Sequence, residues 1–190
     1  HTFSHLYFDE KGIKSDDFIK DALIVEKIFK KKYNFVPKSL VFPRNQINFL
    51  DCFSRTSLKT FRNHDDKFVF NSNGFKLENY NRLARLINDL NIFSNNSKKF
   101  KNNYSYSKMF IRFNLNKYLW NVQMLRLKFL IKNLNDDEII HIWWHPHNLG
   151  FDFELCLKRL LELIEILSNA IEDSDVESKN MVELYQKFRK

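Results

Sequence analysis

The stretch with the strongest bearing on the fold is Glu138-Ile139-Ile140-His141-Ile142-Trp143-Trp144-His145-Pro146. Its apolar, β-favouring residues predict a buried strand over residues 138–145, and Pro146 ends it because proline has no N–H to donate to a sheet. Side chains alternate between the two faces of a strand, which gives one face with His141, Trp143 and His145 and another with Ile142 and Trp144. His147 follows in the loop. This strand predicts a sheet whose end carries histidine and tryptophan side chains.

Outward from this stretch, helices and strands alternate along the chain. Apolar residues at three-to-four spacing predict helices at 15–32, 77–93, 115–133 and 152–170, with a short helix near 47–53 and another within 176–189. Short β-rich runs predict strands at 39–42, 58–61 and 68–70. The alternation favours an α/β fold with a mainly parallel sheet, open or closed. The length favours a single domain over 1–190, and the polar run 94–108 is expected to be a loop.

Composition excludes several classes of protein. With 44% hydrophobic and 28% charged residues the chain is globular rather than disordered or fibrous. Two cysteines, without a Cys-x-x-Cys pair, provide neither a thiolate zinc knuckle nor a disulfide framework. No apolar run approaches the roughly 18 residues of a membrane span. Because the first residue is His1 rather than methionine, we read the sequence as the fragment of a longer protein.

The net charge of +8 raises the question of a polyanionic partner. Lys, Asn and Phe, whose codons are rich in A and T, dominate the composition, and this bias explains the basic balance without a partner. The lysine runs 30–32 and 98–101 lack the interleaved Arg and Gly of RNA-binding segments. We therefore predict no nucleic-acid partner, and a basic nucleic-acid-binding domain remains the less favoured alternative.

Five of the six histidines fall into two short clusters, at residues 1–5 and 141–147. The four-residue separation of His1 and His5 puts both imidazoles on one side of the chain, where both could ligate one cation. A zincin protease would need Glu where Thr2 stands, which excludes that reading. The second cluster lies at the carboxyl end of the predicted strand, where α/β proteins place their sites. We expect His145 to belong to a site and His141 to the core.

Three segments, in order along the chain, resemble a known family. His1-Thr2-Phe3-Ser4-His5 is similar to the metal-binding motif of the polysaccharide deacetylases, which share the chitooligosaccharide deacetylase (NodB) homology domain. Phe42-Pro43-Arg44-Asn45-Gln46, followed by residues 141–148 with the sequence HIWWHPHN, is similar to a branch found among bacterial surface-glycan genes. The resemblance implies a distorted (β/α) barrel of about seven strands, here incomplete at its N-terminus and represented by its C-terminal two-thirds.

The resemblance also implies roles for individual residues. His1 and His5 match the two metal-binding histidines, and His145 matches the histidine that acts as general acid. Arg44 matches the arginine that orders the active site, although Asn45 and Gln46 replace the Pro and Tyr that usually follow it. Trp143 stands in place of the usual leucine. The family's third metal ligand and its base are aspartates of an upstream motif, which this sequence does not contain.

The implied activity is that of a metal-dependent hydrolase, zinc being the expected cation, which removes N-acetyl groups from an amino sugar or polysaccharide. Trp143, His147 and Asn148 are expected to bind substrate, His145 and Arg44 to act in catalysis, and His1 and His5 to hold the metal. Without the base, the fragment itself is expected to be inactive. The alternative is a non-catalytic glycan-binding relative, in which the tryptophans stack on sugar rings without chemistry.

Overall fold

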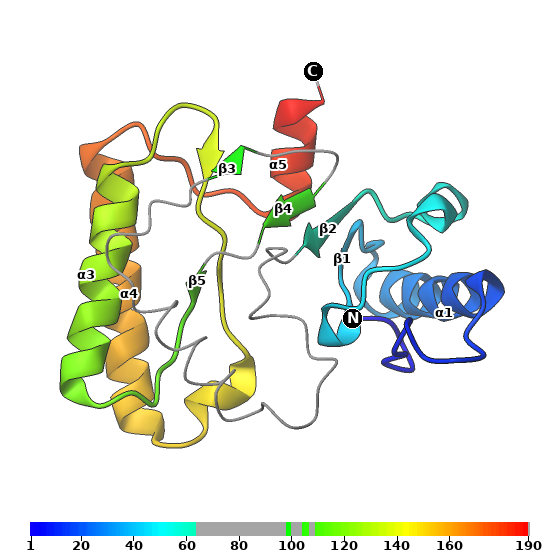
Figure 1. The fold of residues 1–190 in the computed structure, drawn as a ribbon, viewed down its shortest axis with the longest axis horizontal. Helices are drawn as coiled ribbons and strands as arrows, with labels where there is room; N and C mark the ends of the chain where they lie inside the picture. The colour runs from blue at the N-terminus through cyan, green and yellow to red at the C-terminus, as the bar shows by residue number, and fades with distance from the viewer. Residues whose placement is uncertain (64–97, 100–103, 107–108, 190) are drawn as a thin grey trace. The chain divides into compact units, whose positions relative to one another are not determined.

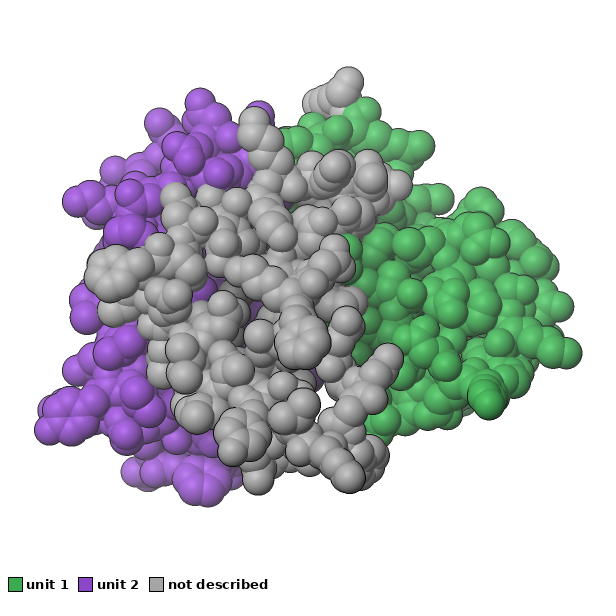
Figure 2. All heavy atoms as spheres, viewed as in Figure 1, with its two compact units in different colours: residues 1–64, 100–106, 179–190 green, residues 65–99, 107–178 purple. Residues whose placement is uncertain are grey.

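The computed structural model describes residues 1–63, 98–99, 104–106 and 109–189. The chain divides into two compact units, coloured separately in Figure 2. Unit 1 comprises residues 1–64, 100–106 and 179–190, and unit 2 comprises residues 65–99 and 107–178. Each unit has a hydrophobic core of its own.

Unit 1 is built on a three-stranded sheet in which all neighbours are parallel. The strands β1 (Ser39–Val41), β2 (Thr60–Asn63) and β4 (Tyr104–Tyr106) follow the order β1-β2-β4 (Figure 1). The register pairs Val41 with Arg62, and Arg62 with Ser105. Since parallel strands end at the same edge of a sheet, Arg62 and the residues that follow β1 share its carboxyl edge.

Helix α1 (Ser15–Tyr33) is the longest helix described in unit 1. The side chain of Asp17 accepts a hydrogen bond from the backbone N–H of Lys14 at 2.9 Å, and Lys30, Lys31 and Lys32 complement the C-terminal end of the dipole. At the other end, the backbone N–H of Asn34, in a left-handed conformation, donates to the carbonyl of Lys30 at 3.2 Å. The predicted helix at 15–32 is confirmed.

Phenylalanine rings fill the space between α1 and the sheet. Phe18 is completely buried and stacks on Phe53 with ring centroids 5.9 Å apart and an interplanar angle of 2°. Phe8 meets Phe42 edge to face, at 5.7 Å and 85°. Offset stacks and edge-to-face pairs are the favourable geometries for aromatic rings. The rest of this core consists of Ile19, Ala22, Leu40, Cys52, Leu58 and Phe61, with Phe49 partly buried against it.

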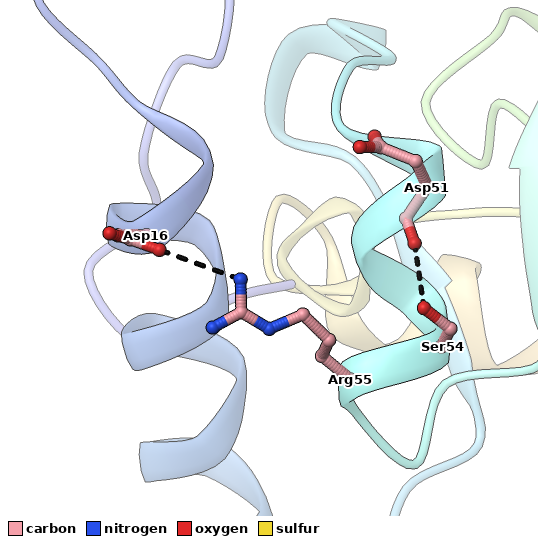
Figure 3. Close-up of polar contacts among 4 residues, drawn as sticks. All are labelled: Asp16, Asp51, Ser54 and Arg55. Carbon is pink, nitrogen blue, oxygen red and sulfur yellow. Dashed lines mark hydrogen bonds and ion pairs between the residues drawn. The ribbon is translucent and has the colours of Figure 1, made fainter.

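One ion pair joins α1 to η2, a 3-10 helix at Leu50–Arg55 (Figure 3). The guanidinium of Arg55 lies 3.6 Å from the carboxylate of Asp16, and the two side chains are 63% and 69% exposed. Beside them, the Ser54 hydroxyl donates to the Asp51 carbonyl at 2.9 Å. Exposed pairs of this kind contribute about 0–1 kcal/mol, so the stability of unit 1 depends mainly on its aromatic core. The C-terminal helix α5 (Met181–Phe188) packs against β2 and β4.

Unit 2 pairs two long helices, α3 (Lys117–Lys132) and α4 (Phe153–Asp173), with very short strands (Figure 1). The side chains of Asn116 and Asp152 cap these helices by accepting from the backbone N–H of Leu119 and Leu155 at 3.0 and 3.1 Å. β5 (Met109–Phe110) runs parallel to β7 (Ile142–Trp143), and β3 (Lys98–Lys99) runs antiparallel to β6 (Glu138–Ile139). Within the described ranges, no helix has both the length and the apolar character required for crossing a membrane.

The expected distorted (β/α) barrel of about seven strands is wrong. The described strands form three separate groups of three, two and two strands, none of which closes into a barrel, and helices account for most of the described residues. The physical reason lies in the stretch predicted as one strand over 138–145. Its first part, β6, pairs with β3 and its second part, β7, pairs with β5, so its hydrogen bonds are divided between two partners instead of extending one ladder.

Of the other elements predicted from the sequence, several are confirmed and one is wrong. The helices expected at 115–133 and 152–170 and the strands at 39–42 and 58–61 are observed as α3, α4, β1 and β2. The expected loop 94–108 contains β3 and β4, which the polar composition of that run concealed. The strand expected at 68–70 and the helix expected at 77–93 lie outside the described residues.

Replacing Phe18 with alanine tests the importance of the aromatic core. Removing this fully buried ring should lower the free energy of unfolding of unit 1 by about 3–5 kcal/mol, because the cavity forfeits contacts with several neighbouring rings. Leu23, on the same helix and 44% exposed, provides the control, and Leu23→Ala should cost less than about 1 kcal/mol. Denaturant titrations followed by circular dichroism give both values, and equal losses would contradict the described packing.

Candidate functional site

Six residues from three segments of unit 1 form a connected group that includes the residues just after β1. They comprise the N-terminal residues His1, His5 and Tyr7, the residues Arg44 and Asn45 just after β1, and Arg62 in β2. We call this group the basic-aromatic cluster. Open parallel sheets bind their ligands at the carboxyl ends of the strands, where loops from different strands converge. The position of the cluster is therefore that of a binding site.

The rings of His1 and His5 lie against each other, with centroids 4.7 Å apart and an interplanar angle of 58°. A turn between them brings them together. Its Ser4 donates to Asp21 on α1, from the backbone N–H at 3.0 and 3.1 Å and from the hydroxyl at 2.7 Å. Asp21 is only 4% exposed, so the anchor belongs to the interior of the unit. The proximity expected from the four-residue spacing is observed, while the role of these imidazoles as ligands stays a prediction.

Tyr7 links the histidine pair to Arg44. Its ring centroid lies 5.7 Å from that of His5, in an edge-to-face arrangement at 80°. On Tyr7, the guanidinium carbon of Arg44 sits 4.0 Å from the ring centroid. A cation this close to an aromatic face is attracted by about 0.5–2 kcal/mol. The exposed Arg44 side chain thus has a preferred resting position beside the histidines.

Arg44 and Asn45 both adopt left-handed backbone conformations, with φ angles of 51° and 56°. Arginine is seldom found there, and such a residue costs on the order of 1 kcal/mol or more. The turn is held by backbone hydrogen bonds from Asn45 to the Phe42 carbonyl and from Gln46 to the Pro43 carbonyl, each 3.0 Å long. A strained conformation maintained in this way is typical of functional sites.

Arg62 is the most buried arginine of the cluster. It is only 7% exposed, and its guanidinium donates to the side-chain oxygen of Asn45 at 2.9 Å. Burial lowers the pKa of Arg62 to about 10, because removal from water disfavours the charged form.

The second histidine cluster lies in unit 2, around η4, a 3-10 helix at Pro146–Leu149. The His145 ring meets Trp143 edge to face at 5.3 Å and 88°, and it stacks on His147 at 5.0 Å and 15°. Asn148 fixes the loop, since its side-chain oxygen accepts from the His145 backbone N–H at 3.2 Å and its own N–H donates to the His145 carbonyl at 2.9 Å. Phe110 completes the aromatic surround, 4.4 Å from Trp143.

The two tryptophans have different environments. Trp144 and Ile142 pack against the core of unit 2, and Trp144 meets Phe113 edge to face at 5.9 Å. Trp143 lies on the other side with His145, as the alternation of a strand predicts. His141 falls between β6 and β7, where its carbonyl accepts from the Met109 N–H at 3.1 Å. Trp143 is consequently the tryptophan that lines the candidate site.

The structure therefore assembles the expected site residues into two groups. His1, His5 and Arg44 belong to unit 1, whereas Trp143, His145, His147 and Asn148 belong to unit 2. Sequence reasoning missed Tyr7 and Arg62, although Arg62 follows a run predicted as a strand and a charged residue at a strand end is a recognisable signal.

The metal-binding capacity of the described residues is limited. Within residues 1–63, 98–99, 104–106 and 109–189, no three His, Cys, Asp or Glu side chains come together in a group able to hold a metal ion. If His1 and His5 bind zinc as predicted, the site needs at least one further protein ligand.

Comparison with known proteins adds no relative. No family model matches the chain, and no curated protein or solved structure is significantly similar to it. The arguments about function consequently rest on the residues of this chain and on the three-motif resemblance described above.

A pair of substitutions at Arg44 separates backbone strain from side-chain function. Arg44→Gly and Arg44→Ala both remove the guanidinium, but only glycine relieves the left-handed conformation. We expect the glycine variant to be more stable than the alanine variant by about 1 kcal/mol. Thermal and denaturant unfolding of both variants measures the difference, and an alanine variant as stable as the glycine variant would show that position 44 is unstrained.

Proposed function

We propose that the protein is a metal-dependent hydrolase that removes N-acetyl groups from an amino sugar or polysaccharide. The observation that supports this proposal is the close pair of imidazoles, His1 and His5, on a turn anchored by the buried carboxylate of Asp21. The proposal depends on these side chains and on the motif resemblance. It does not require the barrel that was expected from the sequence.

The imidazole pair fits a divalent cation in donor type and spacing. Zinc–nitrogen bonds of about 2.0–2.1 Å put two ligating nitrogens of a tetrahedral site about 3.4 Å apart. The centroid distance of 4.7 Å between the two rings is compatible with such a spacing of their nitrogens. The third ligand and the carboxylate base would come from residues other than those described. When bound, the cation would polarise the acetamido carbonyl.

The residues of unit 2 fit the remaining steps. His145 has the side-chain chemistry to protonate the leaving amine, and its stack on His147 and contact with Trp143 restrict its ring to few orientations. Asn148 accepts a hydrogen bond from the backbone N–H of His145 and donates one to its carbonyl. Trp143 and Phe110 offer an apolar wall on which a sugar ring could lie. In unit 1, Arg44 would order the metal side of the site.

Cobalt binding tests the metal pair directly. Co²⁺ titration of the 190-residue chain, followed by its visible absorption bands, should show weak binding, because the described residues bring two candidate ligands together, His1 and His5, and no third. His5→Ala should weaken this binding at least tenfold, whereas His147→Ala, a matched histidine change in unit 2, should leave it unchanged. Binding that survives His5→Ala would refute the proposed ligand pair, and tight binding that depends on His5 would show that the 190-residue chain supplies further ligands.

Turnover of the protein tests the assignment of His145 as the acid. His145→Ala removes the proton donor and spares the metal ligands, so acetate release from an N-acetylated sugar oligomer should fall at least about a hundredfold at unchanged metal content. His141→Ala serves as the comparison, because His141 contributes to the β5–β7 pairing through its carbonyl. Near-parental turnover in His145→Ala, or a larger loss in a folded His141→Ala variant, would show that the acid was assigned to the wrong histidine.

The alternative of a non-catalytic glycan-binding protein is favoured by the Trp143–Phe110 pair, which resembles the aromatic surfaces that hold sugar rings. The same assay separates the two functions. Binding of N-acetylated oligosaccharides with metal present, without release of acetate, would support the binding function instead.

A further inference from the structure

We propose that the basic-aromatic cluster of unit 1 binds an oxyanion, the phosphate or carboxylate group of an acidic sugar. The inference rests on the proposed function only in naming a sugar as the ligand. It adds that this sugar carries an anionic group. The oxyanion site itself is argued from the side chains of the cluster.

The first argument is that the cluster carries positive charge. The guanidinium groups of Arg44 and Arg62 belong to it, and none of its six members carries a carboxylate. The acid Asp21, on α1, is engaged by Ser4 through three hydrogen bonds. Positive charge at a site attracts an anionic ligand.

The second argument is the availability of Arg44. Across the described residues, its guanidinium makes neither an ion pair nor a hydrogen bond, and its contact is with the face of Tyr7. Stacking on a ring occupies the flat face of a guanidinium and leaves the N–H groups at its edge free to donate. Such an edge matches the paired oxygens of a phosphate or carboxylate. Arg44 is therefore held in an orientation suited to a bidentate contact.

The third argument is the arrangement around Arg44. Asn45 uses its side-chain oxygen to accept from Arg62, which leaves its amide N–H₂ as a donor to a ligand. Arg62 is buried, and a buried charge acts more strongly on a nearby anion than an exposed charge does. The left-handed backbone at both residue 44 and residue 45 places these side chains next to each other at an energetic cost. A role in ligand binding would explain why the protein keeps this unfavourable backbone conformation.

Phosphate binding tests the proposal. The 190-residue chain is titrated with inorganic phosphate by calorimetry at pH 7, at low ionic strength and with EDTA present to exclude metal ions. Saturable binding is expected. Arg44→Met should weaken it at least about tenfold, a loss that corresponds to about 1.4 kcal/mol.

Arg55 provides a matched control in the same unit. It is an exposed arginine on η2 paired with Asp16, so Arg55→Met makes the same change in net charge outside the cluster and should leave phosphate affinity within about twofold of the parent. Circular dichroism confirms that both variants fold. Absence of saturable binding in the parent, or equal affinities in Arg44→Met and Arg55→Met, would overturn the proposal.

Sugar probes identify the source of the oxyanion. Glucosamine 6-phosphate supplies a phosphate, glucuronate supplies a carboxylate, and neutral N-acetylglucosamine supplies neither. Binding of either acidic probe that depends on Arg44, without binding of the neutral sugar, supports the site and names its ligand. Binding of all three to the same extent would refute recognition of the anionic group.

The two proposals fail in different ways. Loss of phosphate binding alongside retained, His5-dependent cobalt binding would overturn the oxyanion site and leave the metal pair intact. Phosphate binding without any cobalt binding would overturn the metal-dependent function and leave the oxyanion site. Because the phosphate titration excludes metal ions, neither result can be mistaken for the other.

Discussion

The parallel pairing of β1 with β2 is the constraint on which the site of unit 1 depends. Its register sets Val41 beside Arg62 and sends both strands toward the same edge. The residues directly after β1, including the left-handed turn at Arg44 and Asn45, consequently lie next to the buried guanidinium of Arg62. The hydrogen bond from Arg62 to Asn45 is the direct result of this register. An antiparallel pairing would have put the end of β1 at the opposite edge from the end of β2.

Helix α1 connects the core of unit 1 to its site. Phe18 and Asp21 lie within one turn of each other on this helix, where Phe18 stacks in the aromatic core and Asp21 holds the turn between His1 and His5. Both side chains are buried. A carboxylate removed from water requires strong partners, and the backbone N–H and hydroxyl of Ser4 supply them. The geometry of the histidine pair is therefore set by packing and by a buried hydrogen-bond network together.

The helices could be predicted from the sequence because their signals are local. Asp16 and Asp17 start α1, the lysines at 30–32 end it, and the apolar spacing reveals its buried face. The barrel prediction failed because strand pairing is a long-range property: the apolar run at 138–145 gives no sign that β6 and β7 take different partners. The left-handed Arg44 and its stack on Tyr7 were equally hidden. Neither an arginine nor a tyrosine signals such a conformation, and the contact joins segments far apart in sequence.

Both units contain a single buried thiol, and this has a practical consequence. Cys156 is completely buried in unit 2, where its sulfur lies 3.7 Å from the carbonyl of Asn148, in the loop that carries His145. Cys52 is buried in unit 1, and burial raises the pKa of its thiol. Reaction with a thiol reagent therefore requires local opening of the surrounding structure. The labelling rate of each cysteine reports the opening equilibrium of its own unit in the unmodified protein.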